Sequence, residues 1–175
     1  MKSSPHPDSG TSASGFTLIE MLVVLTVVGI LATIALPNFK SLMQSQRVKN
    51  ASYELYSGIS LTRSEAIKRN SNATMPVFMA VAMNAKNEPG WSISATTASG
   101  VVPIDTQAYI SGVAMTITGL AAPVKIIYSG NGRTTSAAAV KFQIDASGVT
   151  TPTPFVRCVT IELSGMPRIR QGACT

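Results

Sequence analysis

The feature that most constrains this chain is an apolar run from Phe16 to Leu36. Its 21 residues are mostly Leu, Val, Ile and Ala, and they include one charged side chain, Glu20. A helix advances about 1.5 Å per residue, so the run spans roughly 30 Å, the hydrocarbon thickness of a bilayer. The rest of the chain is not apolar enough to surround such a helix in a soluble domain. The run is therefore predicted to span a membrane.

A cleavable secretory signal is the main alternative interpretation of this run. A polar segment, residues 1–15, precedes the run, and the run is longer than the apolar region of a secretory signal. Its end, "LATIALPNF", is loosely similar to the end of such a signal. This alternative nevertheless explains neither Gly15 nor Glu20.

Glu20 needs an explanation because an acidic side chain in a membrane helix costs about 2.5–3.5 kcal/mol at the helix centre and less near an end. No Lys or Arg lies between Glu20 and Lys40, so no basic side chain within helical reach can pair with it. Cleavage between Gly15 and Phe16 would create an α-amino group one helical turn from Glu20. That cation would pair with the carboxylate on the same chain or on a neighbouring one.

The stretch from Gly15 to Pro37, "GFTLIEMLVVLTVVGILATIALP", resembles the class III signal of type IV pilins and pseudopilins. The resemblance implies that a prepilin peptidase cuts after Gly15 and that the new N-terminal Phe16 is methylated. It also gives Glu20 a role in filament assembly and makes Pro37 the proline that kinks the N-terminal helix. Gly29 weakens the helix further, because glycine costs about 1 kcal/mol in a helix and proline removes a hydrogen bond.

The helical pattern continues beyond Pro37 to about Asn70. Apolar residues recur there at spacings close to multiples of 3.6, which predicts one buried face. The segment Asn70-Ser71-Asn72 is expected to stop the helix. The residues expected on the buried face are Leu42, Ala51, Leu55, Ile59 and Ala66.

The remaining residues predict a β-rich head. Short segments rich in Val, Ile and Thr alternate with Gly, Asn and Pro turns, and "YSGNGRTT" is the clearest hairpin turn. These spacings favour antiparallel sheets, so the expected fold class is α+β, with a long N-terminal helix packed on a β-rich, pilin-like head. The expected strand segments are 74–83, 90–97, 100–110, 112–120, 124–130, 138–148 and 155–163. The expected organisation is a removed leader (1–15), a transmembrane or filament-core half-helix (16–36), an amphipathic half-helix (37–70) and a periplasmic head (71–175).

Two cysteines, Cys158 and Cys174, lie near the C-terminus with 15 residues between them. In an oxidising periplasm they are expected to form a disulfide, which for a loop of this size is worth about 3 kcal/mol. Two reduced, unrelated thiols are the alternative. No histidine cluster or second cysteine pair accompanies them, so no metal and no cofactor are expected.

Catalysis is not expected. The only histidine, His6, lies in the segment predicted to be removed. The acidic residues that follow this segment are scattered without an obvious acid–base pair. Lys2 is the basic residue of the leader and favours a cytoplasmic N-terminal side. The predicted location is therefore the inner membrane, with a single span and a periplasmic head, and then a pilus or pseudopilus.

The segment "LYSGISLTRSEAIKRN", residues 55–70, resembles the GspH/FimT group, which contains type II secretion pseudopilins and the FimT/FimU minor pilins. The resemblance implies that the partners are other pilins or pseudopilins, the prepilin peptidase and the inner membrane. Two functions remain open at this point. One is a minor pilin that is incorporated in, or primes, a type IV pilus, and the other is a GspH-like minor pseudopilin of a type II secretion system.

A basic C-terminal segment adds DNA to the candidate partners. The formal net charge is +6, and "SGMPRIRQGAC" resembles the Gly-Arg-x-Arg element through which FimT-type minor pilins bind DNA. Gly165 and Arg168 match this element, whereas Met166 stands in the place of its first arginine. Arg170 offers a replacement charge, because residues 168 and 170 share one face of a strand. A solvated basic edge is the alternative, and arginine at position 166 is expected to strengthen any binding.

Overall fold

The computed structural model describes residues 15–148 and 153–175, with the side chains of residues 34–38 left out. Contacts divide the chain into two compact units, residues 1–40 and 41–175. The elements of the described residues are α1 (Leu18–Lys68), β1 (Val77–Met83), β2 (Pro89–Thr97), β3 (Gly100–Gln107), β4 (Val113–Thr118), β5 (Lys125–Tyr128), β6 (Val140–Ala146), β7 (Arg157–Ile161) and β8 (Pro167–Gln171).

Helix α1 begins with a capped first turn. The backbone N–H of Glu20 donates to Thr17 Oγ1 at 3.2 Å, so Thr17 satisfies one of the free donors at the helix start. The acidic side chain of Glu20 lies in the first turn, where negative charge interacts favourably with the helix dipole. The helix starts and ends within two residues of the expected bounds, 16 and 70.

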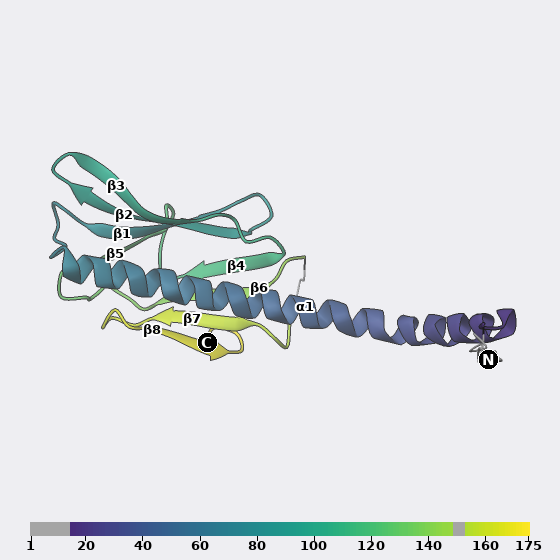
Figure 1. Ribbon diagram of the computed structural model, residues 1–175. Helices are drawn as coiled ribbons and strands as arrows, with labels where there is room; N and C mark the ends of the chain where they lie inside the picture. Colours follow the sequence, from purple (N-terminus) through teal and green to yellow (C-terminus); the bar gives the residue numbers. More distant parts are fainter. Residues whose placement is uncertain (1–14, 149–152) are drawn as a thin grey trace, which may run out of the picture. The chain divides into compact units, whose positions relative to one another are not determined.

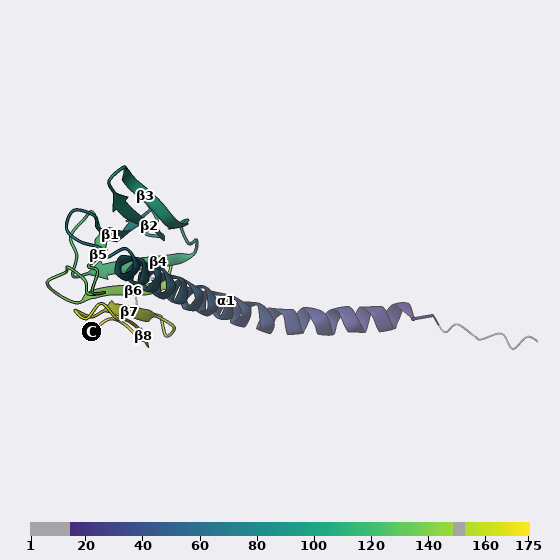
Figure 2. The same cartoon turned by 60° about the vertical axis from the view of Figure 1, so that its left-hand side comes forward.

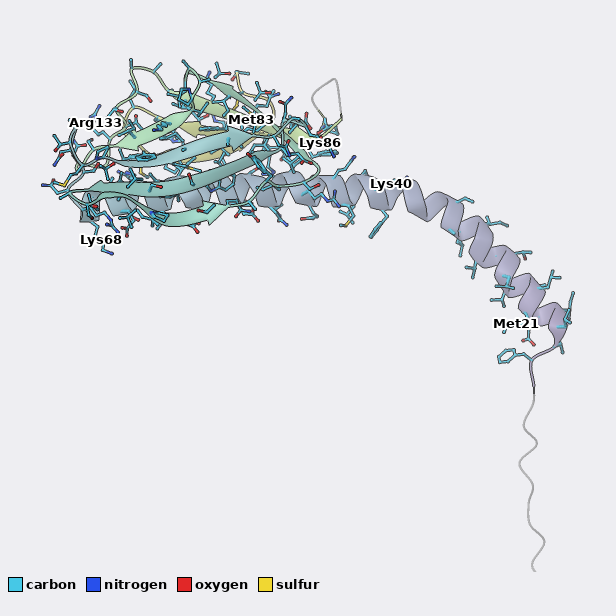
Figure 3. The ribbon with its side chains drawn as sticks, turned by 90° about the horizontal axis from the view of Figure 1, so that it is seen from above. Met21, Lys40, Lys68, Met83, Lys86 and Arg133 are labelled. Atoms are coloured by element: carbon cyan, nitrogen blue, oxygen red, sulfur yellow. A yellow bond between two sulfur atoms is a disulfide. The ribbon has the colours of Figure 1, made fainter. Side chains whose placement is uncertain are left out.

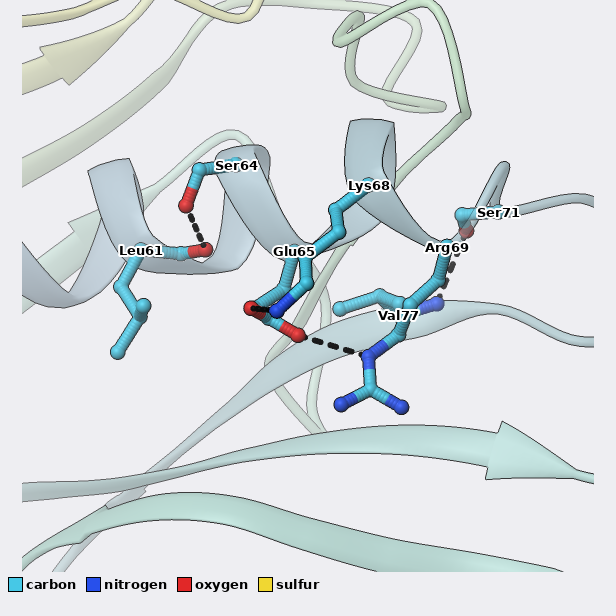
Figure 4. Close-up of polar contacts among 7 residues, drawn as sticks. All are labelled: Leu61, Ser64, Glu65, Lys68, Arg69, Ser71 and Val77. Atoms are coloured by element: carbon cyan, nitrogen blue, oxygen red, sulfur yellow. Dashed lines mark hydrogen bonds and ion pairs between the residues drawn. The ribbon is translucent and has the colours of Figure 1, made fainter.

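The C-terminal end of α1 lies at the expected stop. Asn70 has a left-handed backbone (φ 49°) and its N–H donates to Ile67 O at 3.2 Å, while Ser71 N–H donates to Ala66 O at 2.9 Å. This pair of bonds is the Schellman arrangement that satisfies the last helical carbonyls. Ser71 Oγ then accepts the N–H of Val77 at 2.9 Å (Figure 4) and donates to Tyr128 O at 2.6 Å. The helix end is thereby bonded to β1 and β5.

The second unit contains two four-stranded antiparallel sheets. Sheet A has the order β3-β2-β1-β5, and sheet B has the order β4-β6-β7-β8. Figures 1 and 2 show β1–β3 on one side of α1 and β7 and β8 on the other. All seven expected strand segments contain a strand, and the fold class is the expected one. The structure also has β8, which was not among the seven expected strand segments, although Arg168 and Arg170 were expected to share one face of a strand.

The core of the second unit is built on one face of α1. Most of the buried α1 residues are spaced by three or four, and the apolar ones pack with the inner faces of both sheets. Leu42 was expected on this face, but it is 54% exposed because burial of α1 begins only at Val48. The buried residues of α1 are Val48, Ala51, Ser52, Leu55, Gly58, Ile59, Thr62 and Ala66.

The segment from Tyr128 to Thr135 forms the expected antiparallel turn, but this turn does not join two strands of one sheet. Ser129 N–H donates to Arg133 O at 2.9 Å, and a single bridge joins Tyr128 to Thr134. The chain then leaves sheet A and continues to β6 in sheet B. The turn therefore reverses the chain without pairing two consecutive strands.

The first unit contains the N-terminal part of α1. The helix is continuous through Gly29 and Pro37, but the side chain of Pro37 is outside the described ones, so the kink stays a prediction. Figure 3 draws the side chains that project from the helix between the labelled Met21 and Lys40. Among the helical residues that the structure describes, no stretch is both long and apolar enough to cross a membrane.

Glu88 is a largely buried carboxylate between β1 and β2. The N–H of Gly112 donates to its Oε1 at 2.9 Å, and the side-chain amide of Asn84 donates to its Oε2 at 2.7 Å. These bonds, the one from Gly112 first, hold the pKa of Glu88 below its ordinary value. Glu88 thus ties the β1–β2 turn to the segment before β4.

The lowered pKa of Glu88 predicts a loss of stability in acid. A carboxyl group whose pKa is depressed by folding stabilises the fold above its unfolded pKa, about 4.3, and loses this contribution as pH falls through the folded pKa. Melting followed by circular dichroism between about pH 3 and pH 7 should show Glu88→Gln less stable than wild type at neutral pH and less sensitive to acid. Asp105→Asn, at an exposed site on β3, is the control. Equal acid sensitivity of wild type and Glu88→Gln would contradict the prediction.

Candidate functional site

The N-terminal candidate residues lie together at the start of α1. Gly15 and Phe16 precede the helix, and Glu20 lies in its first turn. Phe16, Glu20, Met21 and Val24 line one small hollow of about 200 Å³. Glu20 therefore lines the same hollow as Phe16, the residue that would carry a new α-amino group after cleavage at Gly15.

An apolar surface surrounds this hollow. Every large apolar side chain from Phe16 to Leu31 is at least 50% exposed, and Phe16 and Leu18 exceed 80%. Monomeric soluble proteins rarely expose a contiguous apolar surface of this kind, and such surfaces mark sites of protein or membrane contact. The arrangement can therefore bury a large apolar area against lipid or neighbouring helices, with a single carboxylate inside it.

The second candidate region is the turn between β7 and β8, which contains Gly165. Gly165 has a left-handed backbone (φ 82°) and is buried, and its N–H donates to Glu162 O at 2.8 Å. A Cβ at this position would lie 2.1 Å from Gly132 O. Gly165 is therefore a residue that the turn requires, and it offers no side chain to a ligand.

Tyr128, the last residue of β5, holds the same turn in place. Its hydroxyl donates to Gly165 O at 2.9 Å, and burial raises the pKa of the phenol well above its usual range. Tyr128 therefore stays protonated and remains a donor at physiological pH. The turn that precedes Arg168 is held to β5 through this bond.

Arg168 and Arg170 lie on β8, which is an edge strand of sheet B. Both side chains are exposed, whereas Pro167 between the turn and Arg168 is buried. The two arginines therefore share the outward side, as their spacing predicts. Arg168 Nε also forms an ion pair with Glu162 Oε1 at 3.1 Å, which the sequence did not indicate because no local pattern links the two residues.

Met166 has an unexpected neighbour in α1. The Arg63 guanidinium contacts Met166 Sδ through Nη1, and its Nε donates to Gly132 O at 2.9 Å. Arg63 and Met166 are 103 residues apart in sequence, so reasoning from motifs missed this pair. A guanidinium is thus present beside the position where the Gly-Arg-x-Arg element would have its first arginine.

The chain beyond β8 is fastened to sheet B. Cys158 and Cys174 form the expected disulfide, with their Cα atoms 5.1 Å apart. Cys174 N–H donates to the Gln143 side chain at 3.2 Å, and the Lys141 ammonium donates to the Thr175 backbone oxygen. Among the described residues, no three or more His, Cys, Asp or Glu side chains gather where they would hold a metal ion. His6 lies outside those residues.

The geometry of Gly165 predicts that Gly165→Ala is strongly destabilising. Gly148 is the matched control, because its φ of 79° is nearly the same but a Cβ there would meet no atom of the described residues within 4 Å. Gly148→Ala should cost only the left-handed backbone penalty of about 1–2 kcal/mol. Gly165→Ala must also displace the Gly132 carbonyl and should cost at least about 3 kcal/mol. Urea unfolding of both variants measures the difference, and equal costs would show that the turn relaxes freely.

Two family models match the chain. The model of the type II transport protein GspH matches residues 51–165, and that of the prokaryotic N-terminal methylation motif matches residues 11–36. Fimbrial protein EcpB of Eikenella corrodens is 46% identical over 41 residues, which are 23% of this chain and 26% of that protein. The type IV major alpha-pilin of Moraxella bovis is 43% identical over 44 residues, 25% of this chain and 28% of that protein. The chain thus aligns with only about a quarter of each of these curated relatives.

Solved structures show the same fold. Crystal structures of the type IV minor pilin FimU of Pseudomonas aeruginosa, in two crystal forms, match with TM-scores of 0.54 and 0.53. The identities are 21% and 18%, and the matches cover 73% of this chain and 89% and 97% of those chains. This likeness establishes a pilin fold. Because the GspH model matches more than half of the chain, and the methylation motif precedes it, the protein belongs to the GspH family of type IV pilin-like proteins.

Proposed function

We propose that the protein is a minor pilin that is incorporated in, or primes the assembly of, a type IV pilus. The observation that carries this proposal is the exposed apolar surface from Phe16 to Leu31, with Glu20 as its only charge. Exposure of this surface to water is unfavourable by about 25 cal/mol per Å² of apolar area. A lipid bilayer before assembly, and neighbouring pilin helices after it, would remove this cost.

The proposal includes the organisation expected from the sequence. A prepilin peptidase removes residues 1–15, residues 16–36 form the single inner-membrane span, and the amphipathic half-helix 37–70 packs with a periplasmic head, residues 71–175. The Cys158–Cys174 disulfide supports a periplasmic head, because disulfides persist in that oxidising compartment. The proposed partners are other pilins.

The proposed organisation predicts that the protein is processed at Gly15. Intact mass spectrometry of protein extracted from the inner membrane should show loss of residues 1–15 and addition of one methyl group, because Phe16 becomes the N-terminus. Gly15→Leu should retain the leader, and Gly29→Leu, at the other glycine of the apolar segment, should not. An unprocessed wild type in cells with an active prepilin peptidase would contradict the prediction.

The proposed pairing of Glu20 predicts a defect in filament assembly when this carboxylate is removed. Glu20→Ala should insert into the membrane normally, because it removes a costly charge, and should keep the helix start, because Thr17 binds the backbone of residue 20. It should be depleted from filaments sheared from the native cell, because the carboxylate no longer pairs with an N-terminus. Thr26→Ala, a polar change on the same segment whose side chain bonds its own helix, is the control. Equal recovery of Glu20→Ala and wild type in filaments would refute the pairing.

A minor pseudopilin of a type II secretion system is the second candidate. The observation that favours it is the description of the matching family as a type II transport protein. Deletion of the gene in the native cell separates the two candidates. Loss of surface pili with normal secretion supports the pilin, and loss of secretion with normal pili supports the pseudopilin.

We also propose that the outward arginines of β8 bind DNA through its phosphates. Arg168 and Arg170 are exposed on one side of an edge strand, and arginine pairs well with phosphate oxygens. Glu162 competes with phosphate for Arg168, because the two form an exposed ion pair at 3.1 Å. The charge of Glu162 should therefore weaken DNA binding.

Variants that remove the arginines and a variant that removes the competing glutamate should change DNA binding in opposite directions. Replacing both Arg168 and Arg170 by Gln should weaken binding of the full chain in detergent to duplex DNA and flatten its salt dependence by about 0.9 per lost phosphate contact. Glu162→Gln should strengthen binding, whereas Glu54→Gln, at an exposed site of α1, should change it less. Fluorescence anisotropy at several salt concentrations measures these effects. Identical curves for wild type and the double mutant would leave Arg168 and Arg170 as a solvated edge.

A further inference from the structure

Arg63 is the residue that the proposed functions leave unexplained. It lies on α1 and is half-buried, and its Nε donates to Gly132 O at 2.9 Å. Its Nη1 contacts the Sδ atom of Met166, in the turn just before β8. The three ion pairs among the described residues involve Lys68, Arg69 and Arg168, each with a glutamate, so Arg63 is not neutralised in any of them.

Arg63 lies beside the residue that immediately precedes β8. Met166, Arg168 and Arg170 are exposed, and Pro167 is buried. Met166 belongs to the turn before β8, whereas Arg168 and Arg170 lie on the strand itself, where positions two residues apart are about 6.6 Å apart. Arg63 contacts Met166, so a guanidinium lies next to the uncharged methionine that precedes the two arginines.

A groove gives a ligand access to this guanidinium. Its volume is about 220 Å³, and its lining residues come from α1 and from the start of β8. The hydroxyls of Ser60 and Ser64 donate to carbonyl oxygens of their own helix. Arg63 is the one charged residue among those that line the groove. The lining residues are Tyr56, Ser60, Arg63, Ser64, Ile67, Met166 and Pro167.

We propose that Arg63 supplies the phosphate-binding cation that position 166 lacks, and that Arg63, Arg168 and Arg170 form one strip for the phosphodiester backbone of nucleic acid. This inference rests on the DNA binding proposed above. The bond to Gly132 uses Nε and the contact with Met166 uses one hydrogen of Nη1, so the other Nη hydrogens remain for a phosphate oxygen. A guanidinium already held by the fold also loses less side-chain freedom on binding.

The experiment compares single variants of the full chain in detergent with a short fluorescein-labelled duplex of mixed sequence. Arg63→Gln should lower the slope of log K against log salt by about 0.9. When salt rises fourfold, the affinity of Arg63→Gln should therefore fall by a factor that is roughly three times smaller than the fall for wild type. Arg69→Gln is the control, because Arg69 directly follows the same helix and already binds Glu65 at 2.7 Å. Its effect on the slope should be much smaller.

Two further variants separate charge from fold. Arg63→Lys keeps the charge and should keep most of the slope, whereas a role limited to holding Gly132 would make Lys and Gln equally harmful. Met166→Arg should restore the slope in the Arg63→Gln background. It should add little to wild type, because a second guanidinium would be placed against Arg63, so the expected strengthening at position 166 depends on Arg63.

The outcomes distinguish this inference from the function on which it rests. No binding by wild type at low salt overturns both. Binding that depends on Arg168 and Arg170 but has the same slope in Arg63→Gln as in wild type overturns the role of Arg63 and leaves DNA binding intact. A lower slope in Arg63→Gln, with rescue by Met166→Arg, supports the three-arginine strip.

Discussion

Burial of one face of α1, from Val48 to Ala66, is the constraint on which the second unit depends. Both sheets have their apolar inner faces in the same core as this helix face, so neither sheet is covered without it. Truncation of a buried leucine such as Leu55 typically costs 2–5 kcal/mol, a large part of the stability of a domain. The helix is therefore a structural centre of the head as well as its connection to the apolar segment.

A short chain of hydrogen bonds connects the end of α1 to the turn before β8, the strand that contains Arg168 and Arg170. Ser71 follows α1 and bonds the carbonyl of Tyr128, and the Tyr128 hydroxyl bonds the carbonyl of Gly165. Each donor is largely buried, where an unsatisfied carbonyl would cost about 1–3 kcal/mol. The turn before Arg168 is consequently positioned by the core as well as by its own residues, of which Gly165 is one.

Local patterns predicted most of the fold, and non-local contacts account for what they missed. The helix stop at Asn70 has a recognisable chemistry, and seven strand segments have the Val, Ile and Thr content of strands. Strand β8 has a single buried-side aliphatic residue, Ile169, between two arginines, so its sequence gave a weak strand signal. Leu42 fits the helical period but precedes the region that the sheets cover. The Arg63–Met166 contact joins distant segments and has no local signature.

Edge protection offers a simpler reason for part of the basic surface. Exposed sheet edges invite unwanted pairing, and charged residues, proline and bulges discourage it. In sheet A, the edge strand β3 has Pro103 and an irregular register near Ile93. Arg168 and Arg170 would protect β8 in the same way, so their exposure alone does not require a ligand. Arg63 is different, because it lies on a helix and is held by Gly132, and edge protection does not account for it. Arg63 is therefore a sharper test of the proposed nucleic-acid binding than Arg168 and Arg170, the two arginines that the sequence motif singled out.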